Sequence, residues 1–192
     1  DGEVDLLNRL CVPLPIYVIA DQLGVPRSEL TLLKKWSDAS TSRLGRLADE
    51  EQQIQNAKDI VEFQHYFADL IDRMREHPED NIISDLANNT IDEGRLLTKP
   101  EALGMIQQIL VAGNETSTNA IAGGVVLLIE NPEEQAKLRT KPDLIPTAVE
   151  EILRLETPTS GMWRRATQDT EIDGVAIPEG SFLMVRFAAG NR

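Results

Sequence analysis

The pattern of apolar and polar positions predicts one long helix near the middle of the chain, over residues 98–130. Thr98 and Glu101 form a capping box, and Pro100 lies in the first turn, where its missing N–H costs little. The helix is expected to end at Asn131, because a proline follows that residue and disfavours helical geometry before it. Both halves of the segment are apolar on nearly all sides, which is typical of a buried helix.

The centre of this helix breaks the apolar pattern with a run of polar residues from Asn114 to Asn119. Hydroxyl side chains can bond back to the preceding turn and bend a helix, and Gly113 beside them favours a kink. Glu115 is unusual, because a carboxylate amid apolar residues is costly unless it is paired or handles protons. The run is either a polar notch that faces a neighbouring helix or a buried water, or a functional site. The density of polar groups favours the site.

The rest of the chain is predicted to be mainly α-helical, with a small β-hairpin or sheet edge near the C-terminus. A helical opening over residues 1–21 contains two prolines that interrupt it, and a short helix over 15–24 ends on a glycine. Further helices are predicted over residues 27–42, 50–76, 80–88, 131–139 and 147–156. Alternating side chains and turn residues predict β structure over 170–178 and 181–185.

Composition and charge exclude several functional classes. The 192 residues suffice for one domain with a real core, and the net charge of −13 argues against nucleic acid as a partner. The longest apolar run, residues 120–129, is too short to cross a bilayer, and no signal peptide is visible. The single cysteine, Cys11, excludes an internal disulfide and fits a reducing cytoplasm. His65 and His77 have no neighbours at metal-ligand spacing, so no metal site is expected.

Two segments carry a resemblance to a known family. Ala-Gly-Asn-Glu-Thr-Ser at residues 112–117 resembles the [Ala/Gly]-Gly-x-[Asp/Glu]-Thr-[Thr/Ser] signature of the distal helix, or I helix, of cytochrome P-450. Glu151 and Arg154 share a helix face and could form an ordinary surface ion pair. However, Glu-Ile-Leu-Arg also resembles the Glu-x-x-Arg motif of the family's K helix. In the family these two side chains join a buried network with an arginine from a later loop.

The C-terminal part extends the resemblance. Arg-Arg-Ala-Thr-Gln-Asp at residues 164–169 resembles the Arg-x-Ala-Thr-x-Asp segment that follows the K helix. The resemblance implies that Arg164 pairs with a haem propionate, a contact that suits the planar guanidinium. Arg165 is then a solvated neighbour, although the sequence leaves the opposite assignment open. The last four residues, Ala-Gly-Asn-Arg, resemble the family's Ala-Ala-Asn-Arg.

The resemblance implies a P-450 fold fragment, from about the E helix to the strand after the K helix. Residues 1–192 would then be part of a single catalytic domain, because the family's N-terminal elements and its Phe-x-x-Gly-x-x-x-Cys loop have no counterpart in the sequence. Cys11 does not replace that cysteine, since it precedes the distal helix and lacks the loop's glycines. It is better explained as a small buried apolar residue.

The resemblance also implies a function, a soluble bacterial haem-dependent monooxygenase that hydroxylates a small organic substrate with O2. Its cofactor would be haem b, and its electrons would come ultimately from NAD(P)H through a ferredoxin or flavodoxin-type protein. In that family Thr116 would hydrogen-bond the oxygen, and Glu115 would relay protons to it. Two alternatives stay open, a non-catalytic helical module and a haem-thiolate enzyme of another kind, such as a peroxygenase.

The remaining site residues follow from the same resemblance. Ala112 and Gly113 would leave room beside the haem for oxygen and substrate. The substrate pocket would be lined by Val111 and by the loop that carries Ser160, Gly161 and Met162.

Overall fold

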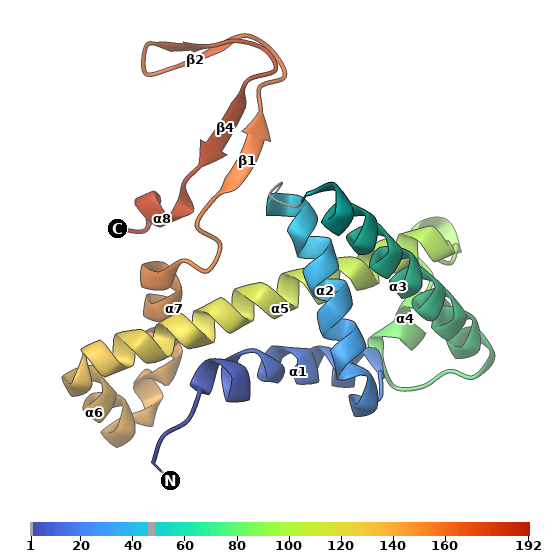
Figure 1. Cartoon of the computed structure of the whole chain (residues 1–192), viewed down its shortest axis with the longest axis horizontal. Helices are drawn as coiled ribbons and strands as arrows, with labels where there is room; N and C mark the ends of the chain where they lie inside the picture. The colour runs from blue at the N-terminus through green and yellow to red at the C-terminus, as the bar shows by residue number, and fades with distance from the viewer. Residues whose placement is uncertain (1, 46–48) are drawn as a thin grey trace. The chain divides into compact units, whose positions relative to one another are not determined.

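The computed structural model describes residues 2–45 and 49–192 and is mainly helical, as predicted, with short strands near the C-terminus (Figure 1). Asp1, where the predicted helical opening begins, lies outside the described residues. The chain divides into two compact units, Asp1–Thr118 and Asn119–Arg192, and the boundary falls within the long helix α5 (Lys99–Glu130).

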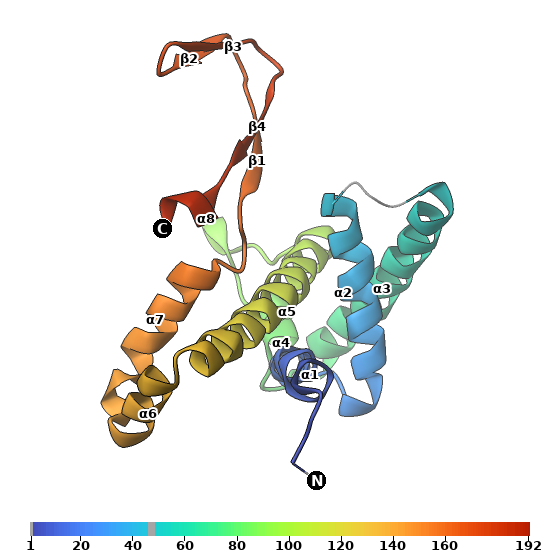
Figure 2. The ribbon, with the colours of Figure 1, turned by 60° about the vertical axis from the view of Figure 1, so that its left-hand side comes forward.

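The first unit is a set of helices gathered around the beginning of α5 (Figures 1 and 2). They are α1 (Pro13–Leu23), α2 (Leu30–Gly45), α3 (Glu50–Glu76) and α4 (Ile82–Asn88), with a π-helical turn at Leu7–Cys11 and 3₁₀ turns at Arg27–Glu29 and Asp92–Gly94. The helix predicted over 27–42 therefore begins with a 3₁₀ turn and continues as α2 to Gly45.

Local signals account for several of the helix ends. The side chain of Asp49 caps α3 by accepting a hydrogen bond of 2.8 Å from the backbone N–H of Gln52. Helix α1 ends at Gly24, whose φ of 67° lies in the left-handed region that glycine adopts without strain. The predicted helical opening is divided where the prolines begin, because a π-helical turn ends at Cys11 and α1 starts at Pro13. Pro13 and Pro15 themselves are compatible with helix α1. Both lie in the first turn of α1, where a proline removes no helical hydrogen bond.

The core of the first unit surrounds Trp36 of α2. The ring of Trp36 lies 5.9 Å from the rings of Phe63 and Phe67 and 5.2 Å from that of Tyr66, all on α3. Edge-on and tilted aromatic contacts of this kind are favourable beyond their buried area. The apolar side chains buried with them are Ile16, Ile19, Ala20, Leu23, Val25, Leu33, Leu70, Ile71, Met74, Ile83, Ala87, Leu97, Ala102, Ile106 and Leu110.

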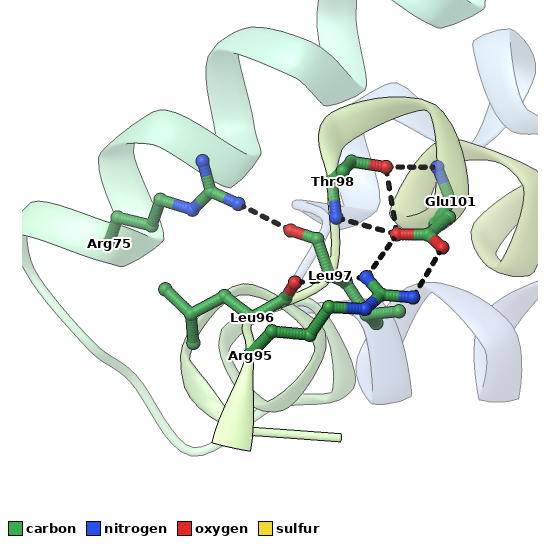
Figure 3. Close-up of polar contacts among 6 residues, drawn as sticks. All are labelled: Arg75, Arg95, Leu96, Leu97, Thr98 and Glu101. Atoms are coloured by element: carbon green, nitrogen blue, oxygen red, sulfur yellow. Dashed lines mark hydrogen bonds and ion pairs between the residues drawn. The ribbon is translucent and has the colours of Figure 1, made fainter. Parts of the chain in front are cut away.

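The predicted capping box at the start of α5 is confirmed (Figure 3). Glu101 accepts hydrogen bonds of 2.8 Å from both the N–H and the hydroxyl of Thr98, and its own N–H donates to Thr98 Oγ1 at 3.4 Å. The guanidinium of Arg95 donates to both Glu101 oxygens at 2.9 Å. These hydrogen bonds, that from Arg95 first, lower the pKa of Glu101 to about 2. Arg75 donates to the carbonyl of Leu97 at 2.9 Å and ties α3 to the same turn.

The second unit contains the rest of α5, two further helices and two small antiparallel sheets. Its helices are α6 (Pro132–Thr140), α7 (Ile145–Glu156), the short α8 (Phe187–Gly190) and a 3₁₀ turn at Pro142–Leu144. The predicted hairpin is confirmed as β2 (Thr170–Ile172) paired with β3 (Val175–Ile177). Strand β4 (Phe182–Val185) pairs with β1 (Met162–Arg165), which the sequence pattern did not predict.

Helix α5 is buried along part of its surface, so the prediction that it is a buried helix and not a surface one is wrong for this chain. In the first unit the buried residues of α5 form a stripe in which each member follows the previous one by four positions: Ala102, Ile106, Leu110 and Asn114. Side chains four apart share one face of a helix, and the core of the unit covers that face alone. In the second unit Ile129 is 67% exposed. Within the described residues, no helix has the length and apolar character needed to cross a bilayer.

Candidate functional site

The middle of α5 presents two different faces to its surroundings. Asn114 continues the buried stripe, and a helix turns by about 100° per residue, so Ala112 and Thr116 lie roughly opposite to it. Ala112 and Glu115 are exposed, and Thr116 is half-buried. The two residues predicted to be catalytic, Glu115 and Thr116, therefore lie away from the core of the first unit.

The hydroxyl of Thr116 bonds back along the helix, as the sequence predicted for this segment. Its Oγ1 donates a hydrogen bond of 2.5 Å to the carbonyl oxygen of Ala112. The helix continues through Gly113 without interruption. This bond holds the hydroxyl beside Ala112 and leaves its oxygen lone pairs available as acceptors.

Gly113 has a packing role that the sequence did not predict. A Cβ at this position would lie 3.1 Å from Cδ1 of Ile19, closer than ordinary van der Waals contact. The glycine therefore allows the side chain of Ile19, on α1, to approach α5. Its predicted role in leaving space beside a haem is a separate proposal.

Asn114 forms the polar notch that was predicted as one of the two interpretations. It is 2% exposed, and its Nδ2 donates a hydrogen bond of 2.9 Å to Oγ of the fully buried Ser37 on α2. Among the described residues, Oδ1 of Asn114 has no hydrogen-bond partner. The polar run thus divides into a buried notch at Asn114 and a pair outside the core, the exposed Glu115 and the half-buried Thr116.

The single cysteine lies in the core of the first unit. Cys11 is 1% exposed, and its backbone carbonyl accepts a hydrogen bond of 3.1 Å from Thr118 Oγ1 on α5. This burial agrees with the expectation that Cys11 is a small apolar residue.

In the second unit, the Glu-x-x-Arg pair forms a bidentate ion pair on α7. Arg154 donates to the two carboxylate oxygens of Glu151 at 2.8 and 2.6 Å. These hydrogen bonds lower the pKa of Glu151 and raise that of Arg154. About half of each side chain is exposed, as expected for the surface-pair interpretation. Arg154 also donates to the backbone carbonyl of Asn191, a contact that the sequence did not predict.

A buried threonine joins the end of α7 to the last residues of the chain. Thr157 has a φ of 43°, and its Oγ1 donates to the carbonyl of Arg154 at 2.8 Å. Asn191 in turn donates from Nδ2 to Thr157 Oγ1 at 2.9 Å. Thr157 and Asn191 are 34 residues apart, so no local pattern indicates this contact. Only the position of Asn191 within Ala-Gly-Asn-Arg could have pointed to it.

The two neighbouring arginines on β1 have different surroundings. Arg164 is exposed and donates to the carbonyl of Trp163 at 3.0 Å. Arg165 points to the other face of the strand, because successive strand residues alternate, and its guanidinium lies 6.0 Å from the ring centroid of Phe182. A cation over an aromatic ring is already engaged. Both arginines are exposed, so the choice of Arg164 over Arg165 for a propionate stays a prediction.

The loop predicted to line a substrate pocket packs against the C-terminal segment. The carbonyl of Ser160 accepts a hydrogen bond of 3.2 Å from Ala188 N, and Met162 pairs with Val185 in the sheet. A Cβ at Gly161 would lie 2.5 Å from the carbonyl oxygen of Val185, so the close approach requires glycine. Val111, the other predicted lining residue, is half-buried on α5 in the first unit.

A separate groove of about 400 Å³ lies within the second unit, between the end of α5, α6 and α7. Its lining includes Leu127, Leu138, Ile152 and Leu155. None of the residues predicted for a substrate pocket lines this groove, so it does not correspond to that pocket.

A family model described as Cytochrome P450 matches residues 47–189. The chain therefore belongs to the cytochrome P450 family, as the motifs in α5 and α7 predicted. The chain is 37% identical over its whole length to the cytochrome P450 monooxygenase PikC of Streptomyces venezuelae and covers 45% of that protein. It is 36% identical to 6-deoxyerythronolide B hydroxylase of Saccharopolyspora erythraea and covers 46% of it. The chain thus spans about half the length of the curated relatives it matches.

Solved structures confirm the fold. The ligand-free cytochrome P450 TbtJ1 superposes with a TM-score of 0.90 at 34% identity, over 98% of this chain and 50% of that one. P450BioI, solved in complex with a fatty-acid-ligated acyl carrier protein, superposes with a TM-score of 0.88 at 34% identity, over 98% of this chain and 48% of that one. The acyl carrier protein is a partner of P450BioI, and the sequence of the present chain did not predict a partner of that class.

The family implies a haem cofactor, and the described residues fit part of its surroundings. Ala112 leaves a small, uncovered surface next to Thr116 on α5, which suits a flat apolar ring. Arg164 offers an exposed guanidinium for a propionate. Cys11 does not fit as the thiolate ligand of the iron, because it is buried in the first unit and is 1% exposed. The residues present therefore fit the distal side and a propionate contact.

Proposed function

We propose that this chain supplies the distal, oxygen-activating part of a haem-dependent monooxygenase that acts on a small organic substrate. The observation that carries the proposal is the position of Glu115 and Thr116 on α5, where they follow the small residue Ala112 on the side away from the core. In the complete enzyme the electrons would come from NAD(P)H through a ferredoxin or flavodoxin-type protein, and the enzyme would work in the cytoplasm. Haem, when bound, supplies the electron-transfer and oxidation chemistry, and the protein supplies position and protons.

Three groups of this chain have assigned roles in the proposal. Arg164 would hold a haem propionate by a charge-assisted hydrogen bond. Ala112, with Gly113 beside it, would leave space for oxygen and substrate. Val111 and the loop with Ser160, Gly161 and Met162 would line the substrate pocket.

Proton delivery would depend on the neighbouring acid and hydroxyl. Glu115 is exposed, so its carboxylate can take a proton from solvent. Thr116 Oγ1 would accept the proton from Glu115 on an oxygen lone pair. The hydroxyl would then release its original proton to the space beside Ala112 where oxygen is expected to bind. This release breaks the 2.5 Å hydrogen bond between the hydroxyl of Thr116 and the carbonyl of Ala112. Before the transfer, the carbonyl of Ala112 accepts the hydrogen bond from the hydroxyl of Thr116.

The Thr116→Ala variant of the complete, haem-loaded enzyme tests the proposal. We expect it to consume NAD(P)H while product per NAD(P)H falls, because protons no longer reach the oxygen in step with the electrons. Ser117→Ala is the matched control, since it removes a neighbouring hydroxyl that makes no hydrogen bond among the described residues. Unchanged coupling in Thr116→Ala would remove Thr116 from the proton path.

The Glu115→Gln variant tests the role of the acid independently of the role of the Thr116 hydroxyl. A glutamine keeps the size and polarity of the side chain but cannot carry a proton, so product formation should fall by up to about 10²-fold, the lower range for general acid–base catalysis. A peroxide-driven enzyme would not need this relay, so product formation from peroxide by both the natural enzyme and Glu115→Gln, with none from NAD(P)H by either, would favour the peroxygenase alternative.

A further inference from the structure

A buried polar contact joins α2 and α5. Asn114 Nδ2 donates to Ser37 Oγ at 2.9 Å, and both residues are buried. Their neighbours along the two helices, Trp36 on α2 and Leu110 on α5, are almost fully buried apolar residues. The pair is therefore a buried polar contact beside large apolar side chains of the core.

This contact does not serve stability in an obvious way. Oδ1 of Asn114 has no partner among the described residues, and a buried amide that is only half satisfied is less stable than an apolar side chain of similar size. Apolar contacts, however, have no direction, so they tolerate a shift of one helix along another. A single buried hydrogen bond is lost on such a shift, which is how buried asparagines define register in paired helices.

We propose that Asn114 and Ser37 form a latch that fixes the position of α2 along α5, with Asn114 as a positioning residue. A slide of α2 by one helical turn, about 5.4 Å, would preserve much of the apolar contact but would separate the amide from the hydroxyl. Both polar groups would then be buried without partners. The position of α2 that keeps the Asn114–Ser37 hydrogen bond is therefore preferred over positions shifted by one helical turn.

The latch also fixes the rotation of α5 about its axis. Once Asn114 faces α2, the geometry of the helix places Glu115 about 100° and Thr116 about 200° away from it. This second consequence rests on the proposed function, because it matters only if Glu115 and Thr116 carry protons. The latch itself does not depend on haem, so its test can fail or succeed independently of the monooxygenase proposal.

The test measures the distance between α2 and α5 with spin labels. Thr31 on α2 and Gln108 on α5 are exposed and are replaced by cysteines in the complete chain, with Cys11→Ala to remove the native thiol. We expect one narrow distance distribution in this background. In the Asn114→Leu/Ser37→Ala variant, the apolar interface remains and the latch is gone, so the distribution should broaden or gain a second distance.

The matched control is the neighbouring polar pair at the same interface. Gln107 Nε2 donates to Ser40 Oγ at 3.1 Å, but both residues are only half-buried, so water can replace the lost bond. Gln107→Leu/Ser40→Ala should therefore leave the distance distribution narrow. Equal broadening in this control would overturn the assignment to Asn114 and Ser37.

Two further outcomes would overturn the proposal. A narrow, unshifted distribution in Asn114→Leu/Ser37→Ala would show that apolar packing alone sets the register. Loss of cooperative unfolding in that variant would show that the pair is needed for stability instead of position. We expect the denaturation midpoint of Asn114→Leu/Ser37→Ala to be equal to or higher than that of the background. The midpoint of Ser37→Ala alone should be lower, because this change leaves the amide of Asn114 with no partner.

Discussion

The two units of this chain differ in how they bury their apolar side chains. In the first unit a continuous core includes side chains from α1 to α5, with Trp36, Phe67 and Leu110 almost inaccessible to solvent. In the second unit, large apolar side chains such as Trp163, Val175 and Phe182 are exposed. Burial of apolar area is the main favourable term in folding, so the stability of the chain resides mostly in the first unit.

The same difference appears along α5. Its first part packs with large side chains and the Asn114–Ser37 bond, whereas its last part approaches α7 through glycines. A Cβ at Gly124 would lie 2.9 Å from Cγ2 of Ile152, and one at Gly123 would lie 2.4 Å from a carboxylate oxygen of Glu156. Close helix contact can therefore be achieved either by filling space with side chains or by omitting them.

The largest expected effect comes from the core of the first unit. Phe67→Ala removes a ring that is 0% exposed and should lower the free energy of unfolding by about 3–5 kcal/mol. Phe182→Ala is the matched change in the second unit, where the ring is 57% exposed, and should cost less than about 1 kcal/mol. Equilibrium denaturation measures both values. Similar losses in the two variants would contradict the assignment of stability to the first unit.

A smaller effect is expected where α5 approaches α7. Gly124→Ala forces Ile152 to move and should destabilise this contact by about 1–3 kcal/mol, as overpacking does. Gly104→Ala is the control, because nothing lies within 4 Å of its Cβ, and it should stabilise α5 by about 0.5–1 kcal/mol. Hydrogen exchange of the α7 amides reports the first change. Protection of α7 that is the same in both variants would rule out a tight α5–α7 contact.

The smallest expected effect is a pH dependence that belongs to the first unit. The pKa of Glu101 is lowered to about 2 in the folded chain, so its ionised form is favoured by folding. This contribution to stability is complete above the ordinary glutamate pKa of about 4.3 and is lost as the pH falls towards 2. Urea titrations of the natural chain and of Glu101→Gln should therefore differ at pH 6 and converge at low pH. A constant difference at every pH would exclude Glu101 as the source.

The sequence predicted the features that depend on neighbouring residues. Helix α3 has the predicted bounds, because Asp49 caps its first turn and Pro78 follows its end. The capping box of α5 was predicted for the same reason. The exposure of Ile129 was not predicted, because the apolar pattern indicates which residues can be buried but not whether another element covers them.

Contacts between residues far apart in the sequence could not be predicted from sequence patterns. Strand β1 was missed, because Met162 to Arg165 shows no alternation and is a strand only through its pairing with β4. The Glu115 and Thr116 pair was identified from its motif, whereas the contact of Asn114 with Ser37 joins residues 77 positions apart. Local chemistry thus indicated which residues are special, and the fold determined which of them face each other.

Cys11 gives this chain a natural reporter of its own opening. Because its thiol is buried and no other cysteine is present, a thiol reagent can react only while the segment before α1 separates from the core. The rate of labelling would therefore count such openings directly, much as hydrogen exchange does for amides. Under native conditions the same shielding should protect the sulfur from oxidation and keep copies of the chain from becoming linked through disulfides.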